Sequence, residues 1–223
     1  DFPEHTMAAY RGAIEQGALG FECDIRITKD EVPVLWHDAN MKKEAKNSAI
    51  IANSTYAQVK SIYPALMTLN ELLDLAIENK KSLALETKHP VPTGNRVEEL
   101  VIAELQRRKD AIKKSGINIA IMSFSWFAIE KIKKMDPTIK TVMLLGDITN
   151  KITRRFTSAQ VIGPSVEMIK KSPELVREIK SSGKELYVWT VDSTEDLQYC
   201  ASVGVDIVMT NRPAHARSVL GYS

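Results

Sequence analysis

Short stretches of alternating apolar and polar residues recur along the chain, separated by longer stretches with helical periodicity. The clearest is residues 20–28, where Glu22, Asp24 and Arg26 occupy every second position between apolar side chains. A period of two is typical of a β-strand with two different faces. Together with short apolar runs rich in β-branched residues, this pattern predicts strands at residues 20–28, 83–88, 117–124, 141–145, 161–165, 185–191 and 205–211.

Amphipathic segments between these strands predict helices, and their ends carry recognisable signals. Thr6 is suited to cap the start of the first helix and Gly17 its end, while Gly183 and Gly204 stand where later helices should end. Residues 32–36 form a further extended segment, and Pro33 favours an edge or an extension over a central strand. Helices are predicted at residues 6–16, 69–79, 95–109, 126–135, 172–182 and 194–203.

Alternating strands and helices are typical of βαβ units and therefore of a parallel sheet. Apart from residues 32–36, seven strands are predicted, which a doubly wound sheet could hold, whereas a (β/α)8 barrel requires one more. No GxGxxG sequence follows any predicted strand, so nothing supports a dinucleotide-binding fold. The pattern favours a single α/β barrel domain over residues 1–223, with its first strand missing from the chain.

Composition narrows the classes of partner. The 223 residues have a formal net charge of +2 with interleaved acidic and basic side chains, whereas nucleic-acid-binding proteins usually carry a basic stripe. We therefore expect no nucleic-acid partner. No apolar run reaches the roughly 18 residues of a transmembrane helix, so no integral membrane segment is expected. Cys23 and Cys200 lie among apolar or small residues, which predicts buried, reduced thiols and a cytoplasmic location.

Charged residues cluster at the strand ends that form the active rim of a parallel barrel. Glu22 and Asp24 lie two apart on one strand, so both carboxylates share a face, and paired carboxylates are the usual ligands of Mg²⁺ or Ca²⁺. Glu86 and Lys88 repeat this spacing, and could complete a metal site and contact a phosphate, respectively. The alternatives are an exposed strand face for the first pair and a simple ion pair for the second.

Two further segments suggest a site at the same rim. His37 follows an extended segment and is a candidate general acid or base, with Asp38 either orienting it or capping the next loop. Trp189 closes a strand and could form a wall of the substrate pocket. A structural histidine and a core tryptophan are the respective alternatives.

The ordered set of these segments resembles the glycerophosphodiester phosphodiesterase family across nearly the whole chain. Any one motif is weak, but the full series in this order is specific. The matching segments are PEHT at residues 3–6, FECDIRITKD at 21–30, VLWHD at 34–38, LALETK at 83–88, MSF at 122–124, VWTVD at 188–192 and GVDIVMTNRP at 204–213.

The resemblance implies a TIM barrel with a divalent metal, Mg²⁺ or Ca²⁺, bound by Glu22, Asp24 and Glu86. It implies His37 as one of two acid/base histidines and Lys88 as a phosphate contact. It further implies that Phe124 and Trp189 line a glycerol pocket. The implied partner is a small glycerophosphodiester, which would yield sn-glycerol 3-phosphate and an alcohol.

Three departures from the family pattern stand out. A His-Arg-Gly motif should precede Pro3 on the first barrel strand, so we expect the chain shown to lack that strand and one catalytic histidine. His5 replaces the asparagine of the family's PENT turn, and no catalytic role is expected for it. Residues 41–54 replace a segment rich in Arg and Thr, so substrate contacts are expected to differ there.

Three rival functions remain open at this point. A lysophospholipase D-like enzyme would need an apolar groove, for which the loop at residues 48–56 offers a short apolar patch. An inactive barrel that only binds phosphate or headgroups would follow from the missing histidine. A carbohydrate-active barrel could use Glu22 and Glu86 as its carboxylate pair, but it leaves His37 and Lys88 without a role.

Overall fold

The computed structural model describes residues 2–146 and 151–222. Their contacts divide the chain into two compact units, Asp1–Ile121 and Met122–Ser223, described separately below. The single domain expected over residues 1–223 stays a prediction. Strand β4 (Ile119–Ser123) crosses the boundary between the units.

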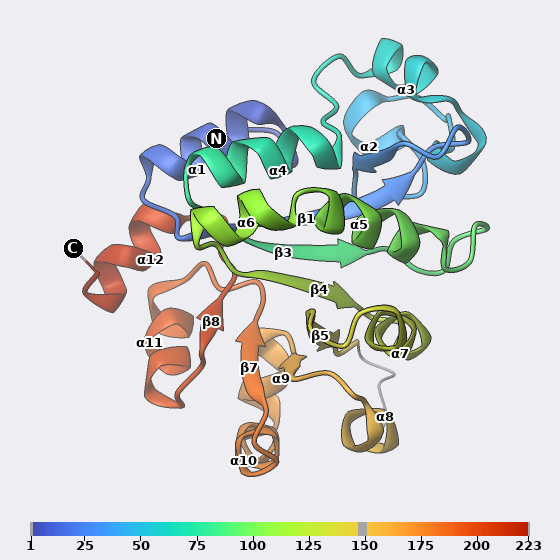
Figure 1. Cartoon of the computed structure of the whole chain (residues 1–223). Coiled ribbons are helices and arrows are strands. Elements are labelled where there is room, and N and C mark those ends of the chain that lie inside the picture. The colour runs from blue at the N-terminus through green and yellow to red at the C-terminus, as the bar shows by residue number, and fades with distance from the viewer. Residues whose placement is uncertain (1, 147–150, 223) are drawn as a thin grey trace. The chain divides into compact units, whose positions relative to one another are not determined.

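The first unit contains strands and helices in alternation (Figure 1). Strands β1 and β3 pair in parallel, and β2 pairs antiparallel to β1 with Ile25 opposite Leu35, as Pro33 at the start of β2 suggested. Its elements are α1 (Met7–Glu15), β1 (Gly20–Ile27), β2 (Pro33–Leu35), α2 (Lys42–Ala45), η1 (Ile51–Asn53), α3 (Tyr56–Ile62), α4 (Leu69–Glu78), β3 (Ser82–Thr87), α5 (Arg96–Arg107) and α6 (Lys109–Ser115).

The second unit continues the same alternation, with β5, β6, β7 and β8 each pairing in parallel with the next. Helix α7 packs on β5, and α10 packs on β7. Its elements are α7 (Trp126–Met135), β5 (Lys140–Leu144), α8 (Lys151–Phe156), β6 (Val161–Gly163), α9 (Val166–Lys171), α10 (Pro173–Ser181), β7 (Glu185–Val188), α11 (Thr194–Ser202), β8 (Ile207–Val208) and α12 (Pro213–Leu220).

Local chemistry sets the ends of several helices. The Thr6 hydroxyl accepts a hydrogen bond from the Ala9 N–H at 3.2 Å and so caps α1. Thr68 and Glu71 form a reciprocal capping box at the start of α4. Gly17 and Gly183 adopt positive φ values of 78° and 75° directly after helices, where a residue without a Cβ carries no steric penalty. These signals confirm the predicted ends of α1, α4 and α10 to within one or two residues.

All seven predicted barrel strands and five of the six predicted helices are present as single elements in the described chain, and the β-α order is that of a TIM barrel. The sequence analysis missed several short helices. The segment at 95–109 is wrong as one helix, because α5 ends at Arg107 and α6 begins at Lys109. It also missed α12, although Pro213 is a common first residue of a helix.

Candidate active site

An acidic cluster lies on the paired strands β1 and β3. Asp24 lies opposite Glu86 in the parallel register, and Glu22 precedes Asp24 by two residues on β1. Asp24 and Glu86 are buried, while Glu22 keeps some exposed surface. Because the strands are parallel and adjacent, the three carboxyl groups share one face of the sheet, which the spacing predicted for Glu22 and Asp24.

Lys88 follows β3 and is the cation of this cluster. Its Nζ lies 2.8 Å from Glu86 Oε1 and 3.3 Å from Asp24 Oδ1, and only 12% of its side chain is exposed. Burial alone would lower the pKa of Lys88, but the charges of Asp24 and Glu86 outweigh it, so the pKa is raised. The ammonium group is therefore held charged between two carboxylates.

The pKa values of the three acids shift in different directions because their hydrogen bonds and charged neighbours differ. Burial and the neighbouring charges of Asp24 and Glu86 raise the pKa of Glu22 well above its usual range. Burial and Asp24 raise the pKa of Glu86 to about 7. Burial also opposes ionisation of Asp24, but a hydrogen bond with His5 and the charges of Lys88 and His37 lower its pKa. Burial and mutual repulsion thus oppose the simultaneous ionisation of all three carboxyl groups in the absence of a bound cation.

His5 belongs to the same cluster, although the sequence analysis gave it no role. Its Nε2 lies 2.9 Å from Asp24 Oδ2, and its side chain is only 9% exposed. One ligand atom from each of His5, Glu22 and Asp24 lies within 4.8 Å of the others. The only sequence signal was the position of His5 within the PEHT turn, directly before the cap of α1.

His37 lies beyond β2 on an exposed loop. Its Nδ1 lies 2.8 Å from Asp38 Oδ1, so Asp38 orients the ring, which is one of its two predicted roles. The guanidinium of Arg26 donates from Nε and Nη2 to the His37 carbonyl at 2.9 and 2.8 Å. The sequence analysis did not single out Arg26, although its spacing on β1 places it on the same face as Glu22 and Asp24.

Phe124 and Trp189 form an aromatic pair in the second unit. Their ring centroids are 5.6 Å apart at an interplanar angle of 85°, an edge-to-face contact. The indole Nε1 of Trp189 donates to the Gly163 carbonyl at 2.8 Å, which fixes the ring plane. Phe124 is 39% exposed and Trp189 is partly exposed, so the pair presents aromatic surface rather than lying in a closed core.

Comparison with known proteins shows which family the chain belongs to. Residues 1–215 match the glycerophosphoryl diester phosphodiesterase family. The chain belongs to this family. It is 33% identical to a probable glycerophosphodiester phosphodiesterase 1 of Mycobacterium tuberculosis, over 98% of this chain and 88% of that protein. It is 28% identical to a glycerophosphodiester phosphodiesterase of Caldanaerobacter subterraneus, over 95% and 89% of the two chains.

Solved structures of family members share the fold. A Thermotoga maritima glycerophosphodiester phosphodiesterase matches with a TM-score of 0.82 and 21% identity, covering 98% of this chain and 92% of that one. An Oleispira antarctica phosphodiesterase, solved with the product sn-glycerol-3-phosphate, matches with a TM-score of 0.83 and 20% identity, over 98% and 92%. These likenesses confirm the predicted TIM-barrel fold, and membership of the family makes the chain a phosphoric diester hydrolase.

The acidic cluster of this family member has the chemistry of a divalent metal site. Carboxylate oxygens are the preferred ligands of hard cations, and His5 adds an imidazole nitrogen. Burial, together with repulsion between close carboxylates, raises the pKa values of Glu22 and Glu86, and a bound cation would oppose both effects. Glu86 is engaged by Lys88 but lies opposite Asp24, within the same group of side chains.

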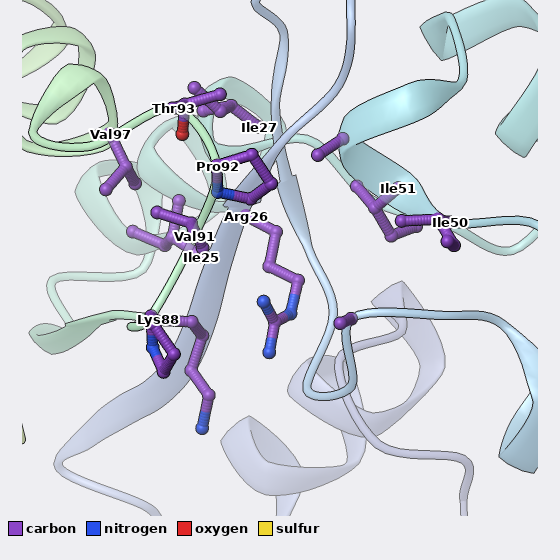
Figure 2. Close-up of a pocket in the computed structure, with 13 residues that line it drawn as sticks. Ile25, Arg26, Ile27, Ile50, Ile51, Lys88, Val91, Pro92, Thr93 and Val97 are labelled. Carbon is purple, nitrogen blue, oxygen red and sulfur yellow. The ribbon is translucent and has the colours of Figure 1, made fainter.

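A small, largely apolar cavity of about 100 Å³ lies in the first unit, close to this cluster. Figure 2 shows Ile50 and Ile51 on one side of it and the segment from Val91 to Val97 on the other, with Arg26 between them. Lys88 also lines it, which connects the cavity to the charged cluster. Ile50 and Ile51 belong to the apolar patch noted at residues 48–56.

The remaining histidines have structural partners. His89 places Nε2 2.8 Å from Oε1 of the fully buried Glu98. His215 contacts the Thr194 hydroxyl at 3.1 Å near the surface of the second unit. No helix in residues 2–146 and 151–222 has the length and apolar character needed to cross a bilayer.

Proposed function

We propose that this chain hydrolyses glycerophosphodiesters to sn-glycerol 3-phosphate and an alcohol. The observation that carries the proposal is the cluster of Glu22 and Asp24 on β1 with Glu86 and Lys88 on and directly after β3, in a chain of this family. It gathers carboxylates suited to a cation and an ammonium suited to a phosphate. A carbohydrate-active barrel explains neither Lys88 nor the family match.

Glu22, Asp24 and Glu86 would hold the divalent ion, Mg²⁺ or Ca²⁺. When bound, the ion would supply Lewis-acid stabilisation of the charge on the phosphate oxygens, worth several kcal/mol. Asp24 would be the most readily ionised of the three ligands, because His5, Lys88 and His37 lower its pKa despite its burial. Register pairing of Asp24 with Glu86 sets the spacing of these two ligands.

Lys88 and His37 would act on the substrate itself. The Lys88 ammonium, held beside Glu86 and Asp24, can contact a phosphate oxygen as a point charge. His37 can move a proton at Nε2, because Nδ1 is engaged by Asp38. Such a transfer typically contributes about 10²–10⁴-fold to the rate. Phe124 and Trp189 would contact the glycerol moiety with their exposed aromatic surface.

Glycerophosphodiesters are deacylated phospholipids, so the proposed reaction would belong to lipid and glycerol metabolism. A cytoplasmic location is part of the proposal. It is supported by the two buried, unpaired cysteines Cys23 and Cys200, since free thiols are typical of reducing compartments.

The deciding experiment measures release of glycerol 3-phosphate from glycerophosphocholine, with Mg²⁺ or Ca²⁺ added and then with EDTA. We expect release that requires the metal and stops with EDTA. His37→Asn should lower kcat by about 10²-fold or more, whereas His215→Asn, a loss of a histidine outside the site, should leave it unchanged. No release from folded protein with either metal would refute the proposed activity.

The second candidate, a lysophospholipase D-like activity, is favoured by the apolar cavity at Ile50, Ile51 and Val91. Its volume of about 100 Å³ is below the roughly 300–1,000 Å³ of typical ligand pockets, so it fits a few methylene groups rather than a whole acyl chain. Release of choline from a lysophosphatidylcholine, without turnover of glycerophosphocholine, would favour this candidate. Binding of either compound without turnover would indicate the inactive, headgroup-binding barrel.

A further inference from the structure

We propose that His5 is a direct nitrogen ligand of the divalent metal in this chain, in addition to the three carboxylates. The inference rests on the proposed metal site and deepens it, because it concerns which ion the site prefers. Its basis is the position of the imidazole, the direction of its hydrogen bonds and the fixation of its backbone.

The imidazole is placed among the proposed ligands rather than behind them. His5 Nε2 lies 2.9 Å from Asp24 Oδ2, and ligand atoms of His5, Glu22 and Asp24 lie within 4.8 Å of one another. The side chain is buried, so few waters compete for Nε2. These spacings allow one ion to contact all three side chains.

A contact on the other side of the ring holds its orientation. The Tyr10 hydroxyl donates to the Glu22 carbonyl at 3.2 Å, and its oxygen lies 3.1 Å from His5 Nδ1. Nε2 faces the carboxylates, and its 2.9 Å hydrogen bond with Asp24 Oδ2 is the contact that a bound ion would replace. Metal-binding histidines typically donate their second ring N–H to an oxygen, which fixes the ring.

The backbone around His5 is also fixed. His5 has a φ of 55°, in the left-handed region, and precedes Thr6, the cap of α1. The Thr6 hydroxyl donates to the Pro3 carbonyl at 2.9 Å and accepts from the Ala9 N–H. These two hydrogen bonds connect the turn that contains His5 to the first turn of α1. Histidine and asparagine both tolerate positive φ better than most residues, so His5→Asn changes the donor atom with little added strain.

A nitrogen donor changes the metal preference of an otherwise all-oxygen site. Carboxylate and water ligands suit Mg²⁺, Ca²⁺ and Mn²⁺, whereas imidazole is better suited to later transition metals such as Co²⁺ and Zn²⁺. With His5 as a ligand, the site should favour Co²⁺ over Mg²⁺ more strongly than a site of three carboxylates does. If His5 only hydrogen-bonds to Asp24, replacing it should weaken all ions alike.

Metal binding can be measured without any reference to turnover. Pulsed EPR of the Mn²⁺-loaded protein should show coupling to an imidazole ¹⁴N, absent in His5→Asn and retained in His215→Asn. Calorimetric titrations should show the ratio of Co²⁺ to Mg²⁺ affinity falling about 10–100-fold in His5→Asn. Tyr10→Phe, which removes the hydroxyl in contact with His5 Nδ1, should lower this ratio less.

The outcomes separate this inference from the proposals beneath it. Mn²⁺ bound without ¹⁴N coupling, or an unchanged ratio in His5→Asn, would overturn the ligand role of His5 while leaving a carboxylate metal site. No binding of any divalent ion to the wild type would overturn both. Coupling from His5 in a protein that releases no glycerol 3-phosphate would support the ligand and refute only the proposed activity.

Discussion

The two units of the chain bury different kinds of side chain. Within the described residues, every buried charged side chain lies in Asp1–Ile121, namely those of Asp24, Glu86 and Glu98. Among the described residues of Met122–Ser223, the buried polar side chains are the hydroxyl-bearing ones of Ser123, Thr141 and Thr157, around an apolar core that includes Ile129, Leu186 and Val188.

The buried charges of the candidate site therefore lie in the first unit, whereas the second unit has a mainly apolar core. Burying an ionised carboxylate is unfavourable unless a cation or hydrogen bonds compensate. The first unit meets this requirement with Lys88 at Asp24 and Glu86 and with His89 at Glu98. The second unit has no such demand and presents the Phe124–Trp189 pair on a packed scaffold. Substitutions in the two units should therefore affect different measurements.

The largest effect is expected from Glu86→Gln in the first unit. Loss of a metal-binding carboxylate should lower metal-dependent turnover by about 10³-fold or more, since the metal's contribution is several kcal/mol. Kinetics with saturating metal would measure this change. Turnover and metal affinity that both match the wild type would remove Glu86 from the site.

In the metal-free protein, by contrast, Glu86→Gln should raise the free energy of unfolding near pH 7 relative to the wild type. Burial and Asp24 raise the pKa of Glu86 from 4.5 to about 7, so the folded wild type prefers the protonated carboxyl. The stability that this preference contributes is present below about pH 4.5 and is lost as the pH rises towards 7. Glu86→Gln should lack that decline, which denaturant titrations at several pH values would measure.

Leu186→Ala in the second unit should act on stability instead. Leu186 is fully buried in β7, so the cavity left behind should lower the free energy of unfolding by about 2–5 kcal/mol. Metal affinity of the folded protein should not change. Leu19→Ala, at a side chain that is 69% exposed, is the matched control, with an expected change within about 0.5 kcal/mol. Equal losses for both variants would contradict the burial argument.

The smallest effect is expected at Asp192 in the second unit. Burial opposes its ionisation, but the Asn211 side chain and N–H and the Thr210 hydroxyl donate to it at 2.7–2.9 Å and lower its pKa. Its contribution is therefore present above the unfolded pKa of about 3.9 and is lost as the pH falls further. Asp192→Asn should lose about 1 kcal/mol at neutral pH, and the difference from wild type should shrink in acid.

Sequence reasoning reached most of the fold because strand and helix signals are local. Alternation over residues 20–28 and the caps at Thr6 and Gly17 depend on near neighbours, and the structure confirms them. The short helices α2, α3 and α9 escaped because four to seven residues carry too little periodicity to recognise. For such segments, packing decides the conformation more than local propensity does.

The candidate site was predicted in part for the same reason. Glu22 and Asp24 share a strand face by spacing alone, and Glu86 with Lys88 repeats it. His5 was missed because its hydrogen-bond partner Asp24 is 19 residues away in the sequence. Arg26 was missed because its partner is a backbone carbonyl, that of His37, which no side-chain pattern reveals.

The sequence by itself determined the order of strands and helices, the face shared by the acids and the family. These follow from periodicity, caps and ordered motifs, which depend on near neighbours and on the order of residues in the sequence. The tertiary structure alone decided that Asp24 meets Glu86 in register, that Lys88 lies between them and that His5 turns Nε2 towards the cluster. Those contacts arise from pairing between distant segments, and they set the charge and hydrogen-bond direction on which the site's chemistry depends.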